Sequence, residues 1–69
     1  MVKLRLRLSY MLFDEHGNAL GSWTDRNEAL IELSEFLRMY PEMKDLVALL
    51  EYDRRGLPTE VLYPPEEEA

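Results

Sequence analysis

Apolar and polar residues alternate strictly along residues 2–13, which indicates one long β-strand. A period of two puts successive side chains on opposite faces of a strand, and a run of this length is a strong signal. We expect the even-numbered face to enter the core, while the odd-numbered face changes from basic to apolar along its length. The even-numbered face carries Val2, Leu4, Leu6, Leu8, Tyr10 and Leu12, and the odd-numbered face carries Lys3, Arg5, Arg7, Ser9, Met11 and Phe13.

A short turn signal occurs twice in the chain. Phe13-Asp14-Glu15-His16-Gly17 and Tyr52-Asp53-Arg54-Arg55-Gly56 share an aromatic residue, an Asp, two polar residues and a Gly. The Asp side chain can cap a turn, and Gly supplies the positive φ that a type I turn with a G1 bulge requires. The repeat predicts two hairpins, with returning strands over residues 19–23 and 57–63.

Between the two turn signals the spacing of apolar residues changes to that of a helix. Thr24 is the expected N-cap. The acidic side chains in the first turn fit a helix start, because the helix dipole stabilises negative charge there. Pro41 should end the helix, because proline pushes the preceding Tyr40 out of the α region. The expected core stripe of the helix comprises Ala29, Leu30, Leu33, Phe36, Leu37 and Tyr40.

Residues 42–53 fit two structures. Met43, Leu46, Val47 and Leu50 match a second helix, whereas Leu46, Ala48, Leu50 and Tyr52 match a strand. Periodicity cannot decide over so short a run. The turn signal that follows favours a strand, since a hairpin needs a strand on both sides of its turn.

These elements predict an α+β fold of the order ββαββ, in which two hairpins form one sheet and a single helix packs on one face. We expect residues 1–63 to form one small domain. Residues 64–69 combine two prolines with three acidic residues, a composition typical of a disordered tail. A chain this short buries only about 60% of its unfolded surface, so oligomerisation is a common way to stabilise it.

Composition narrows the possible functions. The 69 residues include 14 acidic and 8 basic side chains, for a net charge of −6, with no cysteine and one histidine. An acidic chain lacks the basic field of a general nucleic-acid binder, and without cysteine a thiolate metal site is impossible. No apolar run is long enough to cross a membrane. We expect a cytoplasmic protein without a cofactor, and no binding to nucleic acid or membranes.

The most informative candidate site is an apolar surplus on the sheet. One helix covers one face, yet the first and third strands carry apolar residues on both faces, which usually means that another surface packs there. A homodimer interface is the first interpretation and a different protein partner the second. The alternatives are that the long strand curls, or that residues 42–53 are helical and cover this face. The expected interface residues are Met11, Phe13, Trp23, Val47 and Leu49.

Charged residues offer weaker candidates. Lys3, Arg5 and Arg7 form a basic ladder on one strand face, which could contact phosphates or an acidic partner. A solvent-exposed strand face with charges that discourage aggregation explains the ladder equally well. Glu28, Glu32 and Glu35 share one helix side; they could bind a divalent cation, but they match the wet face of an amphipathic helix. His16 lies at a hairpin tip, where a catalytic base would have no pocket.

The stretch from Gly17 to Leu30, GNALGSWTDRNEAL, resembles the strand, Thr-capped turn and Glu-Ala-Leu helix start of many short uncharacterised bacterial proteins with the order ββαββ. The resemblance covers residues 9–63. More distantly, the stretch is similar to the partly degenerate RNase-like domain of HicB antitoxins, which bind a small basic toxin. The usual Pro-Gly-Cys-like strand end of HicB and its DNA-binding domain are missing from these 69 residues. The resemblance implies a small non-catalytic module and carries over no functional residue.

Catalytic motifs are absent from the sequence: it contains no nucleophile elbow, phosphate-binding glycine loop, zinc-ligand spacing or dinucleotide fingerprint. We therefore expect a non-catalytic intracellular protein-interaction module that forms a homodimer. The alternative is an acidic antagonist, such as an antitoxin or a phage-type inhibitor, of a basic or nucleic-acid-binding protein.

Overall fold

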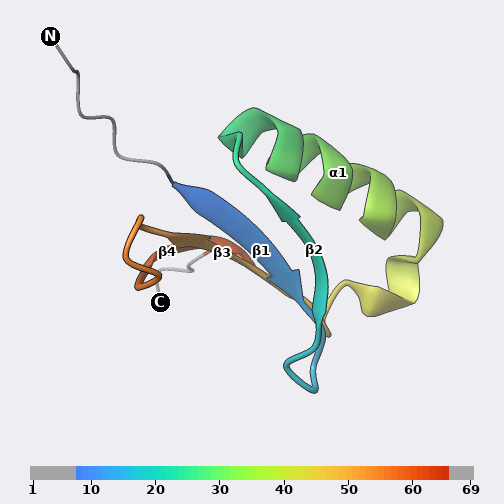
Figure 1. The fold of residues 1–69 in the computed structure, drawn as a ribbon. Coiled ribbons are helices and arrows are strands. Elements are labelled where there is room, and N and C mark those ends of the chain that lie inside the picture. The colour runs from blue at the N-terminus through green and yellow to red at the C-terminus, as the bar shows by residue number, and fades with distance from the viewer. Residues whose placement is uncertain (1–7, 66–69) are drawn as a thin grey trace, which may run out of the picture.

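The fold is one four-stranded sheet with a single helix (Figure 1), as the computed structural model of residues 8–65 shows. This confirms the predicted α+β fold with the order ββαββ. The part of the predicted long strand before Leu8 and the end of the predicted tail lie outside the described residues. The elements are β1 (Ser9–Phe13), β2 (Ala19–Trp23), α1 (Arg26–Met39), the short 3₁₀ helix η1 (Pro41–Met43), β3 (Ala48–Tyr52) and β4 (Pro58–Tyr63).

All neighbouring strands are antiparallel, in the order β2-β1-β3-β4. Both hairpins of the sequence are therefore present, and β1 joins them by pairing with β3. In this central ladder Leu12 lies opposite Leu49, and Met11 lies opposite Leu50. Helix α1 packs over β1 and β2 on one face of the sheet, so the β4 side of the sheet extends beyond the helix (Figure 1).

The two predicted turns have the same hydrogen bonds. In each, the carbonyl of the Asp accepts from the Gly amide, at 3.0 Å for Asp14 and Gly17 and at 2.9 Å for Asp53 and Gly56. The Asp14 carboxylate also accepts from the amides of His16 and Asn18. The Asp53 carboxylate accepts in the same way from the amides of Arg55 and Leu57. Gly17 has φ 82° and Gly56 has φ 87°. The turn prediction is therefore confirmed at both sites, including the positive φ of each glycine.

These amide donors change how the turns respond to acid. The hydrogen bond from the Asn18 amide is the largest effect that lowers the pKa of Asp14, and the Leu57 amide acts in the same way on the pKa of Asp53. A carboxylate with a lowered pKa stabilises the fold above its ordinary value of 3.8, and this contribution is lost as the pH falls through the folded pKa.

Alanine in place of either turn glycine should destabilise the protein by about 1 kcal/mol, because an L-residue is strained at positive φ. A Cβ atom at Gly17 or Gly56 would meet no atom within 4 Å, so the backbone conformation alone causes the loss. Urea unfolding of Gly17→Ala and Gly56→Ala measures it. Asparagine, which tolerates the left-handed region, is the control at each position and should cost less.

The helix begins one residue later than predicted. Asp25, not Thr24, is the N-cap: its backbone is extended, and its carboxylate accepts from the Glu28 amide at 2.8 Å. Both residue types cap helices well, so the sequence could not separate two adjacent candidates. At the other end, Tyr40 leaves the α region with φ −130° and ψ 70°, as Pro41 predicted. Pro41 then begins η1.

The ambiguous segment at residues 42–53 is a strand only in its second half. Met43 ends η1, and β3 begins at Ala48. The strand interpretation is confirmed for β3, while the preceding residues form the short 3₁₀ helix and a turn. No second helix covers the sheet in the part of the chain that the structure describes.

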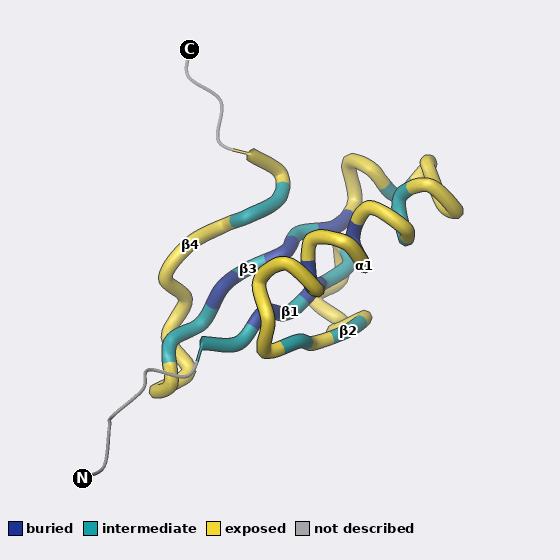
Figure 2. The backbone as a smooth tube through the Cα atoms, turned by 90° about the horizontal axis from the view of Figure 1, so that it is seen from above, coloured by how far each residue is buried: buried dark blue, intermediate teal, exposed yellow. Residues whose placement is uncertain are grey.

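The core lies between α1 and the sheet (Figure 2), and its buried residues come from β1, β3, the segment just before β3, and α1. Tyr10 and Leu12 confirm the predicted even-numbered core face of the first strand. Leu8, Trp23, Phe36, Leu37 and Leu62 are among the half-buried residues packed around this core. The buried apolar residues are Tyr10, Leu12, Ala29, Leu33, Val47 and Leu49.

Candidate interaction surface

The face of the sheet opposite α1, here called the helix-free face, is apolar at its centre. Met11 and Leu50 lie opposite each other there, and alternation along each strand adds the other members. The β4 edge is the most open part, where Val61 is 51% exposed. The helix-free face comprises Ser9, Met11, Phe13, Ala19, Ser22, Ala48, Leu50, Tyr52, Pro58 and Val61.

Charge divides sharply between the two faces. The four described strands contain two charged residues, Glu51 and Glu60. Both lie on the helix side, where they form ion pairs with Arg26 of α1. Among the described strand residues, none on the helix-free face is charged, although the chain as a whole has 22 charged side chains. A sheet face left to solvent normally carries polar and charged residues.

An aromatic pair partly covers the centre of this face. Phe13 and Tyr52 come from opposite ends of the β1–β3 ladder, yet their ring centroids are 6.4 Å apart in an edge-to-face arrangement. Such contacts contribute about 0.5–1.5 kcal/mol beyond area burial. The rings approach each other across the Met11–Leu50 pair, which helps to explain why these two side chains are half-buried.

Three of the five predicted interface residues lie on the other side of the sheet. Val47 and Leu49 are buried in the core, and Trp23 packs against it beside its strand partner Tyr10. Their assignment to an uncovered face is therefore wrong. For Trp23 the reason is local: a Cβ atom at Gly21 would lie 2.7 Å from the indole, so this glycine leaves room for the ring to lie on the sheet. Met11 and Phe13 do lie on the helix-free face.

Sequence reasoning missed the residues that complete this face, chiefly Leu50, Tyr52 and Val61. Two bulges explain part of the omission on β4. The pairing shifts between Glu51 and Tyr52 and again between Leu49 and Leu50, so a simple alternation along β4 does not hold. The sequence did contain a signal for Leu50 and Tyr52. Once the second turn is taken as a hairpin, alternation along the strand before it places both residues on one face of β3.

The helix side holds a buried polar cluster around Glu51. Its carboxylate accepts from the Tyr10 hydroxyl at 3.0 Å and from the Thr59 hydroxyl at 2.6 Å, and it lies 3.6 Å from the Arg26 guanidinium. Arg26 also approaches Glu60 at 3.5 Å. Among the described residues, no buried side-chain nitrogen or oxygen lacks a hydrogen-bond partner. The cluster therefore ties α1, β1, β3 and β4 together at one end of the core.

Tyr10 makes this cluster sensitive to alkali. Burial raises the pKa of its hydroxyl above the ordinary value of 10.0, and the hydrogen bond to Glu51 and its negative charge raise the pKa further. A raised tyrosine pKa stabilises the fold below pH 10.0, and this stability is lost as the pH rises through the folded pKa.

We therefore expect alkaline unfolding in which Tyr10 titrates together with the loss of structure. Circular dichroism and tyrosinate absorbance near 295 nm, a wavelength at which the ionised phenol absorbs, should change in parallel. Tyr10→Phe should weaken the pH dependence above pH 10.0. Tyr40→Phe is the control, because it removes the hydroxyl of an exposed tyrosine outside the buried cluster.

The basic ladder of Lys3, Arg5 and Arg7 lies outside the described residues, so it stays a prediction. The charged candidates within the described residues are exposed to solvent. Glu28, Glu32 and Glu35 are exposed on α1, and Glu35 pairs with Arg38 at 2.6 Å. Residues 8–65 contain no group of three or more His, Cys, Asp or Glu side chains placed to hold a metal ion. His16 is 74% exposed at its hairpin tip, so no pocket surrounds it.

Comparison with family models, curated proteins and solved structures found no match to this chain. No described helix is both long enough and apolar enough to cross a membrane. The functional assignment therefore depends on the surfaces of this molecule alone.

Proposed function

We propose that this chain is a non-catalytic interaction module that associates with a second copy of itself through the helix-free face. The separation of charge between the two sides of the sheet supports the proposal. Both charged strand residues in the described region lie on the helix side, which leaves an apolar face with exposed edges. Two copies of such a face can pack as an aligned β-sandwich, with their strands at about 30°.

The size of the face sets the expected strength of association. Strands lie about 4.8 Å apart and rise about 3.3 Å per residue, so four strands of five residues give a face of about 300 Å² in projection. A standard stable interface buries about 800 Å² of accessible surface per partner, a quantity that is larger than the projected area of the same face. Because the helix-free face is small, we expect a weak dimer that dissociates on dilution.

Val61→Asp tests this proposal by placing a charge at an exposed edge of the helix-free face. Self-association, measured by sedimentation velocity over a range of concentrations, should be lost because each interface would bury an unpaired carboxylate. The melting temperature of the wild-type protein should rise with concentration, as mass action requires of a dimer, whereas that of the variant should not.

Ile31→Asp is the matched control. Ile31 is also β-branched and is 61% exposed, but it lies on α1. This variant should associate like the wild type, although it carries the same added charge. A wild-type protein that stays monomeric at the highest concentration, or an equal loss of association in both variants, would contradict the proposal.

An acidic antagonist of a basic protein is the second candidate. The exposure of Glu28, Glu32 and Glu35 along α1 favours it, since an acidic helix face attracts a basic surface. Binding of this kind should weaken steeply with salt, whereas association through an apolar face should not. Sedimentation of this chain mixed with a basic protein at low and high salt tests the antagonist, and the self-association of the chain alone tests the module.

A further inference from the structure

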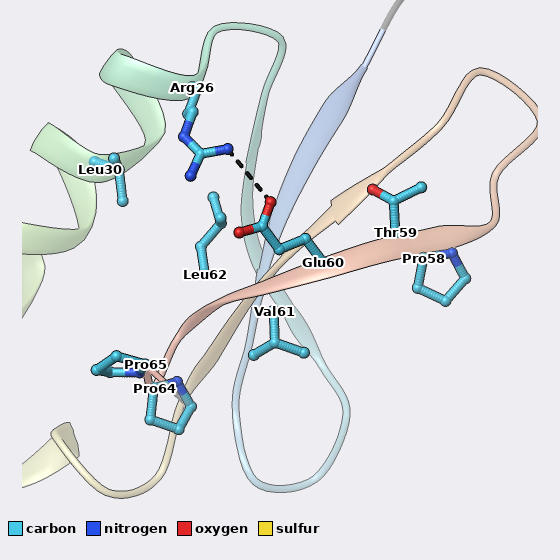
Figure 3. A pocket seen from close by; sticks show the side chains of 9 residues that line it. All are labelled: Arg26, Leu30, Pro58, Thr59, Glu60, Val61, Leu62, Pro64 and Pro65. Carbon is cyan, nitrogen blue, oxygen red and sulfur yellow. Dashed lines mark hydrogen bonds and ion pairs between the residues drawn. The ribbon is translucent and has the colours of Figure 1, made fainter. Parts of the chain in front are cut away.

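A hollow of about 960 Å³ lies between the start of α1 and the edge strand β4. It exists because α1 packs over β1 and β2 and leaves the β4 half of the helix side open. Figure 3 shows Arg26 and Leu30 of α1 facing Glu60 and Leu62 of β4 across it, while Val61 points to the opposite side of the strand. The lining residues are Arg26, Leu30, Pro58, Thr59, Glu60, Val61, Leu62, Pro64 and Pro65.

Arg26 and Glu60 line the polar end of this hollow, and the buried carboxylate of Glu51, which is not part of the lining, lies against Arg26. The Arg26 guanidinium forms ion pairs with two carboxylates, at 3.5 Å from Glu60 and at 3.6 Å from Glu51. Glu51 is almost fully enclosed and uses both oxygens within the buried cluster. Glu60 differs, because its side chain is 51% exposed and its contact with Arg26 is long. The three groups sum to a charge of −1, and Glu60 is the one that a ligand could reach.

The rest of the hollow is apolar. Leu30 is 37% exposed on α1, and Leu62 is half-buried on β4. Pro65 also lines this part. A ligand that fits both parts needs a cationic head and an apolar stem. Lysine and arginine side chains have this form, since their methylene stems cover apolar surface while the charged head stays polar.

We propose that this hollow binds a lysine or arginine side chain of a protein partner, with an apolar neighbour of that residue resting on Leu30 and Leu62. The charged head of the basic side chain pairs with Glu60 and neutralises the carboxylate charge that Arg26 alone does not balance. An acidic ligand would be repelled by the exposed carboxylate of Glu60, and the chain's net charge of −6 favours the approach of a basic partner. Glu60 and Leu62 face the helix side, so this site does not require the proposed dimer.

The test is an NMR titration of the full-length chain with the blocked tripeptide acetyl-Leu-Arg-Leu-amide. The methyl signals of Leu30 and Leu62 should shift and saturate, and acetyl-Leu-Glu-Leu-amide should produce no such shift. Glu60→Gln should weaken binding of the arginine peptide by about two- to five-fold, the range of an exposed ion pair.

Glu35→Gln is the matched control, because it removes the same charge from a side chain that is 55% exposed and also paired with an arginine. Binding to this variant should equal that of the wild type. Equal weakening in both variants would mean general attraction to an acidic protein and would overturn the site. Shifts confined to other surfaces, or equal binding of the arginine and glutamate peptides, would overturn it as well.

Discussion

Replacing Leu49 with alanine is expected to leave most of the protein unfolded at room temperature. Leu49 is 0% exposed and is the largest fully buried side chain of the described core. Truncation of such a leucine costs about 2.7–5.0 kcal/mol, from lost transfer free energy and the cavity that remains. A core of this size supplies only about 3–5 kcal/mol in total. Urea unfolding followed by circular dichroism should therefore show little or no folded baseline.

The neighbouring leucine provides the control. Leu50 is adjacent in sequence but points to the helix-free face, where it is half-buried. Leu50→Ala should cost markedly less than Leu49→Ala, because less surface is removed from the interior. It should also reduce self-association under the proposed function. Similar costs for the two variants would mean that both faces of the sheet are covered equally.

The parts of the fold that the sequence predicted depend on local chemistry. Gly17 and Gly56 occupy positions whose positive φ follows from the turn type. Pro41 fixes the end of α1, because proline cannot continue the helix and restricts Tyr40 before it. Each of these outcomes is decided within a few residues, so no knowledge of distant contacts was needed.

The orientation of β3 depends instead on contacts from far along the chain. Alternation shows that Val47, Leu49 and Glu51 share one face, but not which face enters the core. A charged residue at position 51 favours an outward placement, yet Glu51 is buried. Its partners Tyr10 and Arg26 are distant in sequence, so their contact with Glu51 could not be inferred from the β3 segment itself. The candidate interface was therefore assigned in part to the wrong side of the sheet.

After Leu49, Glu51 is the position at which we expect substitution to destabilise the fold most. Glu51→Ala removes the acceptor for the hydroxyls of Tyr10 and Thr59, and it leaves the buried Tyr10 hydroxyl without a partner. An unsatisfied buried polar group costs about 1–3 kcal/mol. With the loss of the paired charge added, we expect a destabilisation of about 2–4 kcal/mol. Urea unfolding at neutral pH measures this loss.

Glu60→Ala is the natural comparison, since Glu60 lies opposite Glu51 across the β3–β4 ladder and pairs with the same Arg26. Its half-exposed ion pair should contribute only about 0–1 kcal/mol. In a Tyr10→Phe background, Glu51→Ala should cost less than in the wild type, because no hydroxyl is then left unsatisfied. Equal costs for Glu51→Ala in the two backgrounds would show that the hydrogen bond to Tyr10 does not hold Glu51 in the core. The inward orientation of β3 would then have to arise from the packing of Val47 and Leu49 alone.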